Sequence, residues 1–159
     1  MNMHSTISPT LNIGGRLLSL ERPLVMGILN ATTESFYEAS RTPSCEDLVS
    51  RARSMMGEGA TILDVGACST KPGLAPVSEA EEMRRLSTVL ESLRRELPDA
   101  ILSVDTFRAS VAERCVREYG VQMVNDVYGG QADERMFATI ADLQVPYVVA
   151  WASREDEET

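Results

Sequence analysis

The sequence predicts an α/β fold built around a parallel sheet, and three observations support this. Five short apolar runs, typical of strands, lie at residues 23–29, 61–65, 101–104, 121–124 and 145–150. The segments between them carry apolar residues at helical spacing. Strict alternation of strand and helix favours right-handed crossovers and therefore parallel strands. Four of the runs stop at Asn or Asp, which is typical of a site at the carboxyl ends of such strands. An eight-stranded barrel takes about 250 residues, so the predicted sheet is either open or part of a barrel.

Length and composition describe one ordinary domain. The chain has 159 residues, of which 43% are hydrophobic and 25% charged. We expect residues 1–10 to be a flexible N-terminus, residues 11–150 to form the domain and residues 151–159 to be a charged tail. The net charge of −9 argues against a nucleic-acid partner, because phosphate contacts need a basic surface.

The remaining compositional features exclude several classes of protein. No apolar run is long enough to span a membrane, and no signal-peptide pattern opens the sequence, so we expect no membrane partner. Three cysteines without a close pair favour a cytoplasmic protein. Because His4 is the only histidine, a His-based zinc site and a Ser-His-Asp triad are set aside.

The elements of the N-terminal half follow from local signals. Two short apolar runs flank Gly14-Gly15, which predicts a β-hairpin over residues 11–20. Residues 23–29 are almost continuously apolar, which is typical of a strand buried on both faces. Ser44 is expected to cap a helix that ends at Gly57 and Gly59. Its predicted buried stripe consists of Leu48, Ala52, Met55 and Met56.

The C-terminal half continues the same alternation. Ser78 and Glu81 have the spacing of a capping box, and the helix they begin ends before Pro98. Its predicted buried stripe consists of Met83, Leu86, Val89, Leu90 and Leu93. After the strand at 101–104, a helix closed by Gly120 buries Val111, Cys115 and Val116. After the strand at 121–124, the last helix buries Met136, Ile140 and Leu143.

Two of the polar residues that follow the strands point to different chemistry. The Asn30 amide, with a substrate phosphate, suits a hard cation such as Mg²⁺, and it is equally suited to turning the chain. Asp64 lies between Leu63 and Val65 at the predicted end of its strand. We therefore expect it to be buried, where a carboxylate needs a partner.

Asp105 and Asn125 end consecutive strands and can face the same opening. A carboxylate accepts hydrogen bonds and an amide both donates and accepts, so together they can read a flat heterocycle. The more frequent role of an Asp at this position is to cap a helix, here one starting near Thr106. Asn125 also suits a turn.

The segment at residues 69–73, Ser-Thr-Lys-Pro-Gly, is the remaining candidate. Its hydroxyls and cation can hold a carboxylate or phosphate, or the segment can form a surface turn with a solvated lysine. Neither the P-loop nor the dinucleotide glycine spacing occurs in the sequence.

Several of these segments together resemble one known family. Residues 26–36, MGILNATTESF, resemble the motif MGILNVTPDSF. Residues 64–66 and 69–73 are similar to D-[IV]-G-G-x-S-[TS]-[RK]-P-G, and residues 103–106 and 124–126 to the segments SVDT and IND. On these motifs the chain resembles the N-terminal portion of bacterial dihydropteroate synthase, a pterin-binding family.

The resemblance implies a partial TIM (β/α)8 barrel of about five parallel strands and four helices, preceded by the hairpin. It implies condensation of 6-hydroxymethyl-7,8-dihydropterin diphosphate with p-aminobenzoate in folate biosynthesis, with release of pyrophosphate. Asp64, Asp105 and Asn125 would bind the pterin, and Asp64 and Asp105 would be catalytic.

The resemblance also implies residues for the other ligands. Asn30 would bind Mg²⁺. The p-aminobenzoate would be framed by Phe36, Ser69, Thr70 and Lys71.

The sequence departs from the family pattern in places. Thr33-Glu34 replaces Pro-Asp, Ala67 replaces a glycine, and Lys71 stands where arginine is commoner. Motifs of the sixth to eighth strands do not occur in the sequence. We therefore expect no synthase turnover by this chain alone, and pairing of its open sheet edges with a second copy or with a C-terminal half. A pterin-binding methyltransferase module and a non-catalytic relative are the alternatives.

Overall fold

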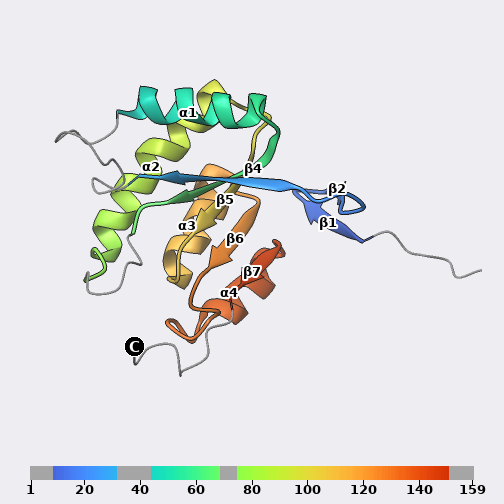
Figure 1. Ribbon diagram of the computed structural model, residues 1–159. Helices are drawn as coiled ribbons and strands as arrows, with labels where there is room; N and C mark the ends of the chain where they lie inside the picture. Colours follow the sequence, from blue (N-terminus) through green and yellow to red (C-terminus); the bar gives the residue numbers. More distant parts are fainter. Residues whose placement is uncertain (1–8, 32–43, 69–74, 151–159) are drawn as a thin grey trace, which may run out of the picture.

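The computed structural model describes residues 9–31, 44–68 and 75–150, and it has the predicted α/β architecture (Figure 1). Five parallel strands form one sheet in the order β3-β4-β5-β6-β7, and an antiparallel hairpin, β1-β2, precedes it. The elements are β1 Thr10–Ile13, β2 Arg16–Ser19, β3 Val25–Asn30, α1 Cys45–Gly57, β4 Ala60–Gly66, α2 Glu79–Glu96, β5 Ile101–Asp105, α3 Ala109–Tyr119, β6 Met123–Asp126, α4 Met136–Leu143 and β7 Tyr147–Val149.

The strand order decides between the winding patterns of parallel sheets. From β4 onward, each strand pairs with its predecessor in the chain, so the order never reverses. A doubly wound sheet reverses direction and places helices on both faces. Here the sheet side chains buried against the helices belong to one core, which indicates that the helices cover one face, as in part of a TIM barrel.

The helix ends follow the capping signals, with one exception. Ser44 and Asp47 form a reciprocal capping box at α1, and Gly120 ends α3 with φ 64°, a left-handed conformation that suits glycine. At α2 the Ser78 hydroxyl accepts from the Glu81 backbone N–H as predicted. The Glu81 carboxylate instead pairs with Arg84 and Arg85, so the capping box predicted there was wrong in its second half.

The core lies between the sheet and the helices, and it contains every residue of the stripe predicted for α2. Side chains on a strand alternate between faces. The positions that face the helices are buried and, apart from Asp126 of β6, carry apolar residues such as Leu29, Leu63, Val65, Leu102, Val104 and Val124. This alternation leaves the intervening residues of β3 to β6 on the opposite face.

The hairpin closes the amino ends of that opposite face. Ile13 from β1 forms a second apolar cluster with Ile62 and Met123. This apolar cluster occupies the amino ends of the strands on this face. The polar residues of the same face lie nearer the carboxyl ends of the strands.

The prediction that residues 23–29 are buried on both faces was wrong. Val25 is 59% exposed and Ile28 58% exposed, whereas Leu29 is buried. Among the described strands β3 pairs with β4 alone and so forms a sheet edge. At the other edge, Val149 of β7 is 50% exposed.

Candidate functional site

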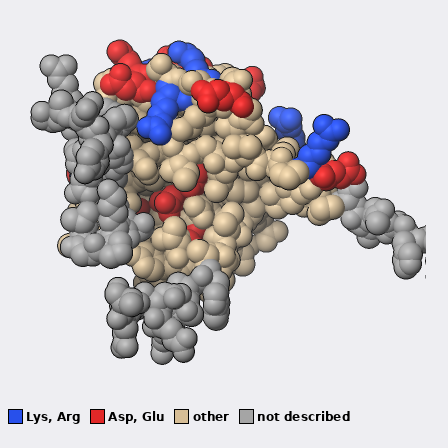
Figure 2. All heavy atoms as spheres, in the orientation of Figure 1, with Lys and Arg blue, Asp and Glu red and all other residues tan. Residues whose placement is uncertain are grey.

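Strand register brings the predicted polar residues to one face. Asn30, Gly66, Asp105 and Asn125 are consecutive partners across β3 to β6, at the carboxyl ends of the strands. One pleat below them, Asp64 is the partner of Ser103. Figure 2 shows acidic atoms recessed in an otherwise uncharged part of the surface.

Asp64 is the buried carboxylate expected from its neighbours, and it is 2% exposed. Its Oδ2 accepts a hydrogen bond of 2.9 Å from Nδ2 of Asn125. The strand predicted over residues 61–65 extends one residue further at each end, to Ala60 and Gly66. Among the described residues, Asp64 Oδ1 and Ser103 Oγ have no hydrogen-bond partner although both atoms are buried. Unpartnered buried polar atoms are costly, and these two indicate where a ligand or a water molecule can bind.

Asp105 does not cap the following helix. α3 begins at Ala109, three residues later than a cap at Asp105 requires, and the Ala109 N–H donates to Oδ2 of Asp133 at 2.9 Å. The N-cap interpretation of Asp105 was therefore wrong, because a residue distant in sequence takes that role. The Asp105 side chain instead lies against Gly66, where a Cβ atom would meet its Oδ2 at 3.3 Å.

The surroundings of Asp105 favour its neutral form. Burial, followed by the negative charges of Asp64, Glu82 and Asp126, raises the pKa of Asp105 to about 7. Near neutral pH the carboxyl group is thus close to half protonated and can either donate or accept a hydrogen bond. A titratable group tuned in this way on a recessed face is characteristic of functional sites.

Asp126, the neighbour of Asn125, serves the fold instead. Its side chain points to the helix face and accepts from the backbone N–H groups of Tyr128 and Gly130, each at 2.8 Å. It also accepts from the Tyr147 hydroxyl at 2.7 Å, and burial together with this bond raises the pKa of Tyr147. Asp126 therefore holds the turn after β6 against β7, beside the candidate site.

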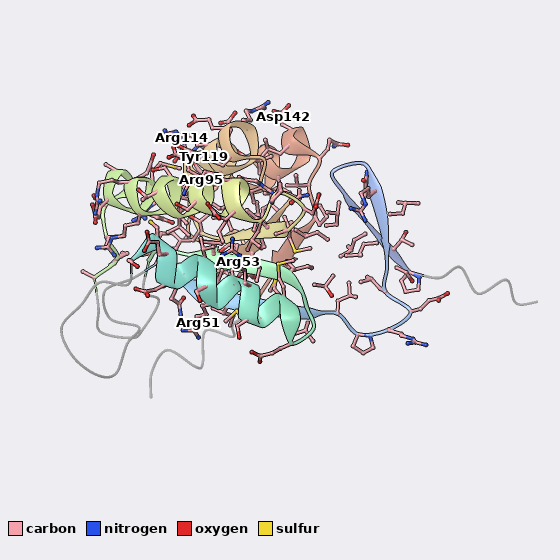
Figure 3. All side chains as sticks on the ribbon, turned by 90° about the horizontal axis from the view of Figure 1, so that it is seen from above. Arg51, Arg53, Arg95, Arg114, Tyr119 and Asp142 are labelled. Atoms are coloured by element: carbon pink, nitrogen blue, oxygen red, sulfur yellow. The ribbon has the colours of Figure 1, made fainter. Side chains whose placement is uncertain are left out.

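The charges on the helix side of the molecule are arranged differently. Arg53, Arg95 and Arg114 lie on the outer helix surfaces (Figure 3), where each is at least half exposed and forms ion pairs. Exposed pairs of this kind contribute about 0–1 kcal/mol. The sheet face thus differs from this solvated helix surface in carrying acidic groups that are buried.

Comparison with known proteins identifies the family. Residues 26–159 match the family described as pterin binding enzyme. The chain belongs to this family. The match contains Asn30, Asp64, Asp105 and Asn125.

Individual relatives of this pterin-binding chain are enzymes of folate synthesis. The mitochondrial folate synthesis bifunctional protein of Pisum sativum is 45% identical over 87% of this chain and 27% of its own length. The dihydropteroate synthase of Bacillus subtilis is 42% identical over 81% of this chain and 45% of its own. The chain therefore spans less than half the length of these curated relatives.

A solved structure supports the fold. The dihydropteroate synthase of Xanthomonas albilineans, determined with 4-aminobenzoic acid, is 38% identical and superimposes with a TM-score of 0.80 over 93% of this chain and 53% of that one. This agreement confirms the predicted partial barrel.

Of the residues predicted to bind metal and the second substrate, the structure describes Asn30. Asn30 is exposed at the end of β3. Within the described residues no group of three or more His, Cys, Asp or Glu side chains could hold a metal ion. Outside the described residues lie Phe36, Ser69, Thr70 and Lys71, together with most of the predicted N-terminal segment and the tail at 151–159. In the described ranges, no helix is long and apolar enough to cross a membrane.

Sequence reasoning missed one buried acid near the site. Glu82 of α2 has no exposed surface, yet in the sequence it reads as part of a solvated acidic run. A signal was present, because Glu82 lies four residues before Leu86 and so falls on the apolar stripe of the helix. A charge on such a stripe indicates a buried partner.

Proposed function

We propose that this chain is the pterin-binding part of a dihydropteroate synthase, which condenses 6-hydroxymethyl-7,8-dihydropterin diphosphate with p-aminobenzoate. The observation that carries the proposal is the Asp64–Asn125 pair beside a carboxyl group of raised pKa, at the carboxyl edge of a parallel sheet. Membership of the pterin-binding family and the similarity to a synthase determined with 4-aminobenzoic acid support the same reading.

The proposed pterin subsite matches the hydrogen-bonding edge of the ligand. A pterin presents an amino group and a ring N–H as donors beside a carbonyl acceptor. The unpartnered Oδ1 of Asp64 can accept from a donor, and the Asn125 amide offers both functions. Asp105, about half protonated near pH 7, can donate or accept as the ligand requires.

The same residues suit the proposed reaction. When the diphosphate leaves, positive charge develops on the methylene carbon attached to the pterin ring, and preorganised carboxylates stabilise such charge in a buried site. We propose that Asp64 and Asp105 do this, while Phe36, Ser69, Thr70 and Lys71 orient the p-aminobenzoate for attack by its amine. Asn30 would hold magnesium, and this ion would supply charge neutralisation for the diphosphate.

Calorimetry tests the ligand assignment. The chain is titrated at pH 7 with the pterin diphosphate, with and without Mg²⁺. We expect magnesium-dependent binding that Asp105→Ala and Asn125→Ala each weaken at least about tenfold, the effect of losing a hydrogen bond to a charged group. The matched control is Asp142→Asn, whose side chain is 72% exposed on α4 (Figure 3). Equal heats for all four proteins, or none for the unsubstituted chain, would overturn the proposal.

Two further titrations separate the alternatives. A synthase fragment should bind a sulfonamide in the presence of pyrophosphate, whereas a methyltransferase module should bind methyltetrahydrofolate. Pteroate formation by the chain alone is expected to remain at background, because the chain spans about half of the solved synthase.

The exposed sheet edges support a proposal about assembly. Val25 of β3 and Val149 of β7 are at least half exposed, and unpaired apolar edges tend to pair with other strands. We propose that this chain pairs with a second copy or with the rest of a longer barrel. Light scattering after size-exclusion chromatography should give a mass above 17.4 kDa, and a monomer at all concentrations contradicts self-pairing.

A further inference from the structure

A buried carboxylate lies behind the candidate site and contacts the segment that follows Asp105. Glu82 of α2 has no exposed surface. Its Oε1 accepts a hydrogen bond of 2.7 Å from Oγ1 of Thr106, and its Oε2 pairs with Nη1 of Arg108. Both oxygens of Glu82 are therefore committed to the three residues after β5.

The same segment is held from two other directions. The Thr106 N–H donates to the backbone carbonyl of Asn125 at 3.0 Å, and Thr106 Oγ1 accepts from the Arg108 N–H at 3.2 Å. Nη2 of Arg108 donates to the carbonyl of Val77 at 2.6 Å, just before α2. The segment that begins one residue after Asp105 is thus tied both to α2 and to β6.

This network is a poor device for stability alone. Burying a carboxylate and a guanidinium costs several kcal/mol of solvation, and apolar residues of similar volume often replace such pairs without loss. Its geometric effect is specific, however. It fixes a bend directly after Asp105, where no helix cap does so, because α3 starts only at Ala109.

We propose that Glu82 is a positioning residue for Asp105. Through Thr106 and Arg108 it fixes the segment after β5, and so fixes the direction in which the Asp105 carboxyl group faces the open side of the sheet. The proposal rests on the proposed function only for the identity of the ligand that Asp105 meets.

The charges around Asp105 make the role of Glu82 measurable. Negative groups on three elements raise the pKa of Asp105: Asp64 on β4, Glu82 on α2 and Asp126 on β6. The cation of Arg108 pairs with Glu82. Removing the acid or the base of this pair therefore breaks the same tether but changes the local charge in opposite directions.

The decisive experiment follows the Asp105 carboxyl carbon by NMR during a pH titration of the chain without ligand. Glu82→Gln keeps an acceptor for Thr106 and removes a negative charge, so the pKa of Asp105 should fall by roughly 0.5 to 1. Arg108→Gln removes the positive charge, so the same pKa should rise. These opposite shifts show that the charges of the pair reach Asp105, and the positioning role itself is tested by variants that break the tether without changing a charge.

A second pair of variants covers the case in which a charge change prevents folding. Thr106→Val keeps the volume but loses the bond to Glu82, which frees the Asp105 segment, so solvation should lower the pKa of Asp105. Thr106→Ser retains the hydroxyl and should restore the original value. Pterin titrations of the same proteins should show about tenfold weaker binding by Thr106→Val and recovery by Thr106→Ser.

The outcomes separate the two proposals. An Asp105 pKa that is the same in Thr106→Val and Thr106→Ser overturns the positioning role. Absence of pterin binding by the unsubstituted chain overturns the proposed function instead, and the ligand-free titration still decides the role of Glu82.

Discussion

Replacing Asp105 by Asn should stabilise the protein, and increasingly so as the pH rises. The pKa of Asp105 is raised from 3.8 to about 7 in the folded chain. Between these values the folded state retains a proton that the unfolded state releases, so this carboxyl group lowers stability progressively as the pH rises and reaches its full cost above about pH 7. At about 1.4 kcal/mol for each pH unit, the full cost is about 4 kcal/mol.

Only part of that cost falls in the range where the measurement is made. Between pH 5 and pH 8 the linkage relation gives about 2–3 kcal/mol, and partial solvent access of Asp105 favours the lower figure. The free energy of unfolding, measured by urea denaturation, should therefore favour Asp105→Asn over the original chain by about 2 kcal/mol more at pH 8 than at pH 5. Asn is matched in size and cannot ionise, so the difference isolates the charge.

A matched control tests whether any Asp to Asn change has this effect. Asp142→Asn replaces an exposed carboxylate and should change stability by no more than about 0.5 kcal/mol across the same range. If the difference between Asp105→Asn and the original chain is the same at pH 5 and pH 8, the raised pKa of Asp105 is refuted. The argument from burial among like charges fails with it.

Three further substitutions probe the same face. Asn125→Ala removes the partner of the Asp64 carboxylate and should lower the free energy of unfolding at pH 7 by about 1–3 kcal/mol in urea denaturation; an unchanged midpoint would show that water replaces the amide without cost. Ser103→Ala removes a buried hydroxyl that has no hydrogen-bond partner among the described residues. It should leave the free energy of unfolding unchanged or raise it by about 1 kcal/mol, and it should weaken pterin binding in calorimetry. A loss of stability with unchanged affinity would contradict a ligand-binding role for Ser103. Gly66→Ala places a methyl group 3.3 Å from Oδ2 of Asp105. It should weaken pterin binding about tenfold with little change in the thermal midpoint of unfolding. Full affinity in this variant would show that the Asp105 side chain moves aside freely.

The parts of the fold that depend on local pattern were predictable from the sequence. Each predicted strand and helix is present, and the five apolar residues expected inside α2 are all buried. The burial of Asp64 followed from its apolar neighbours, and its pairing with Asn125 is consistent with strand ends meeting at one edge of a parallel sheet. These features were predictable because the spacing of apolar residues and the residue types at strand ends depend only on nearby positions in the sequence.

The errors arise where a distant residue decides the outcome. Asp105 looked like a helix cap, but Asp133, 24 residues beyond Ala109, supplies the acceptor. Residues 23–29 looked doubly buried, but the sequence does not reveal which elements cover each face of the sheet. Glu82 was missed altogether, because its partners, Thr106 and Arg108, lie more than twenty residues away.

The two-residue alternation of the central strands has a consequence for how this protein can vary. In β5 the side chains of Ser103 and Asp105 share one surface, while Leu102 and Val104 occupy the core. Deleting one residue inside this strand would turn leucine and valine toward solvent and drive the carboxyl group into the helices. Insertions and deletions in related sequences should therefore be confined to the connections between elements. A one-residue deletion inside β4, β5 or β6 should occur only together with a second change that restores the alternation of side chains between the two faces.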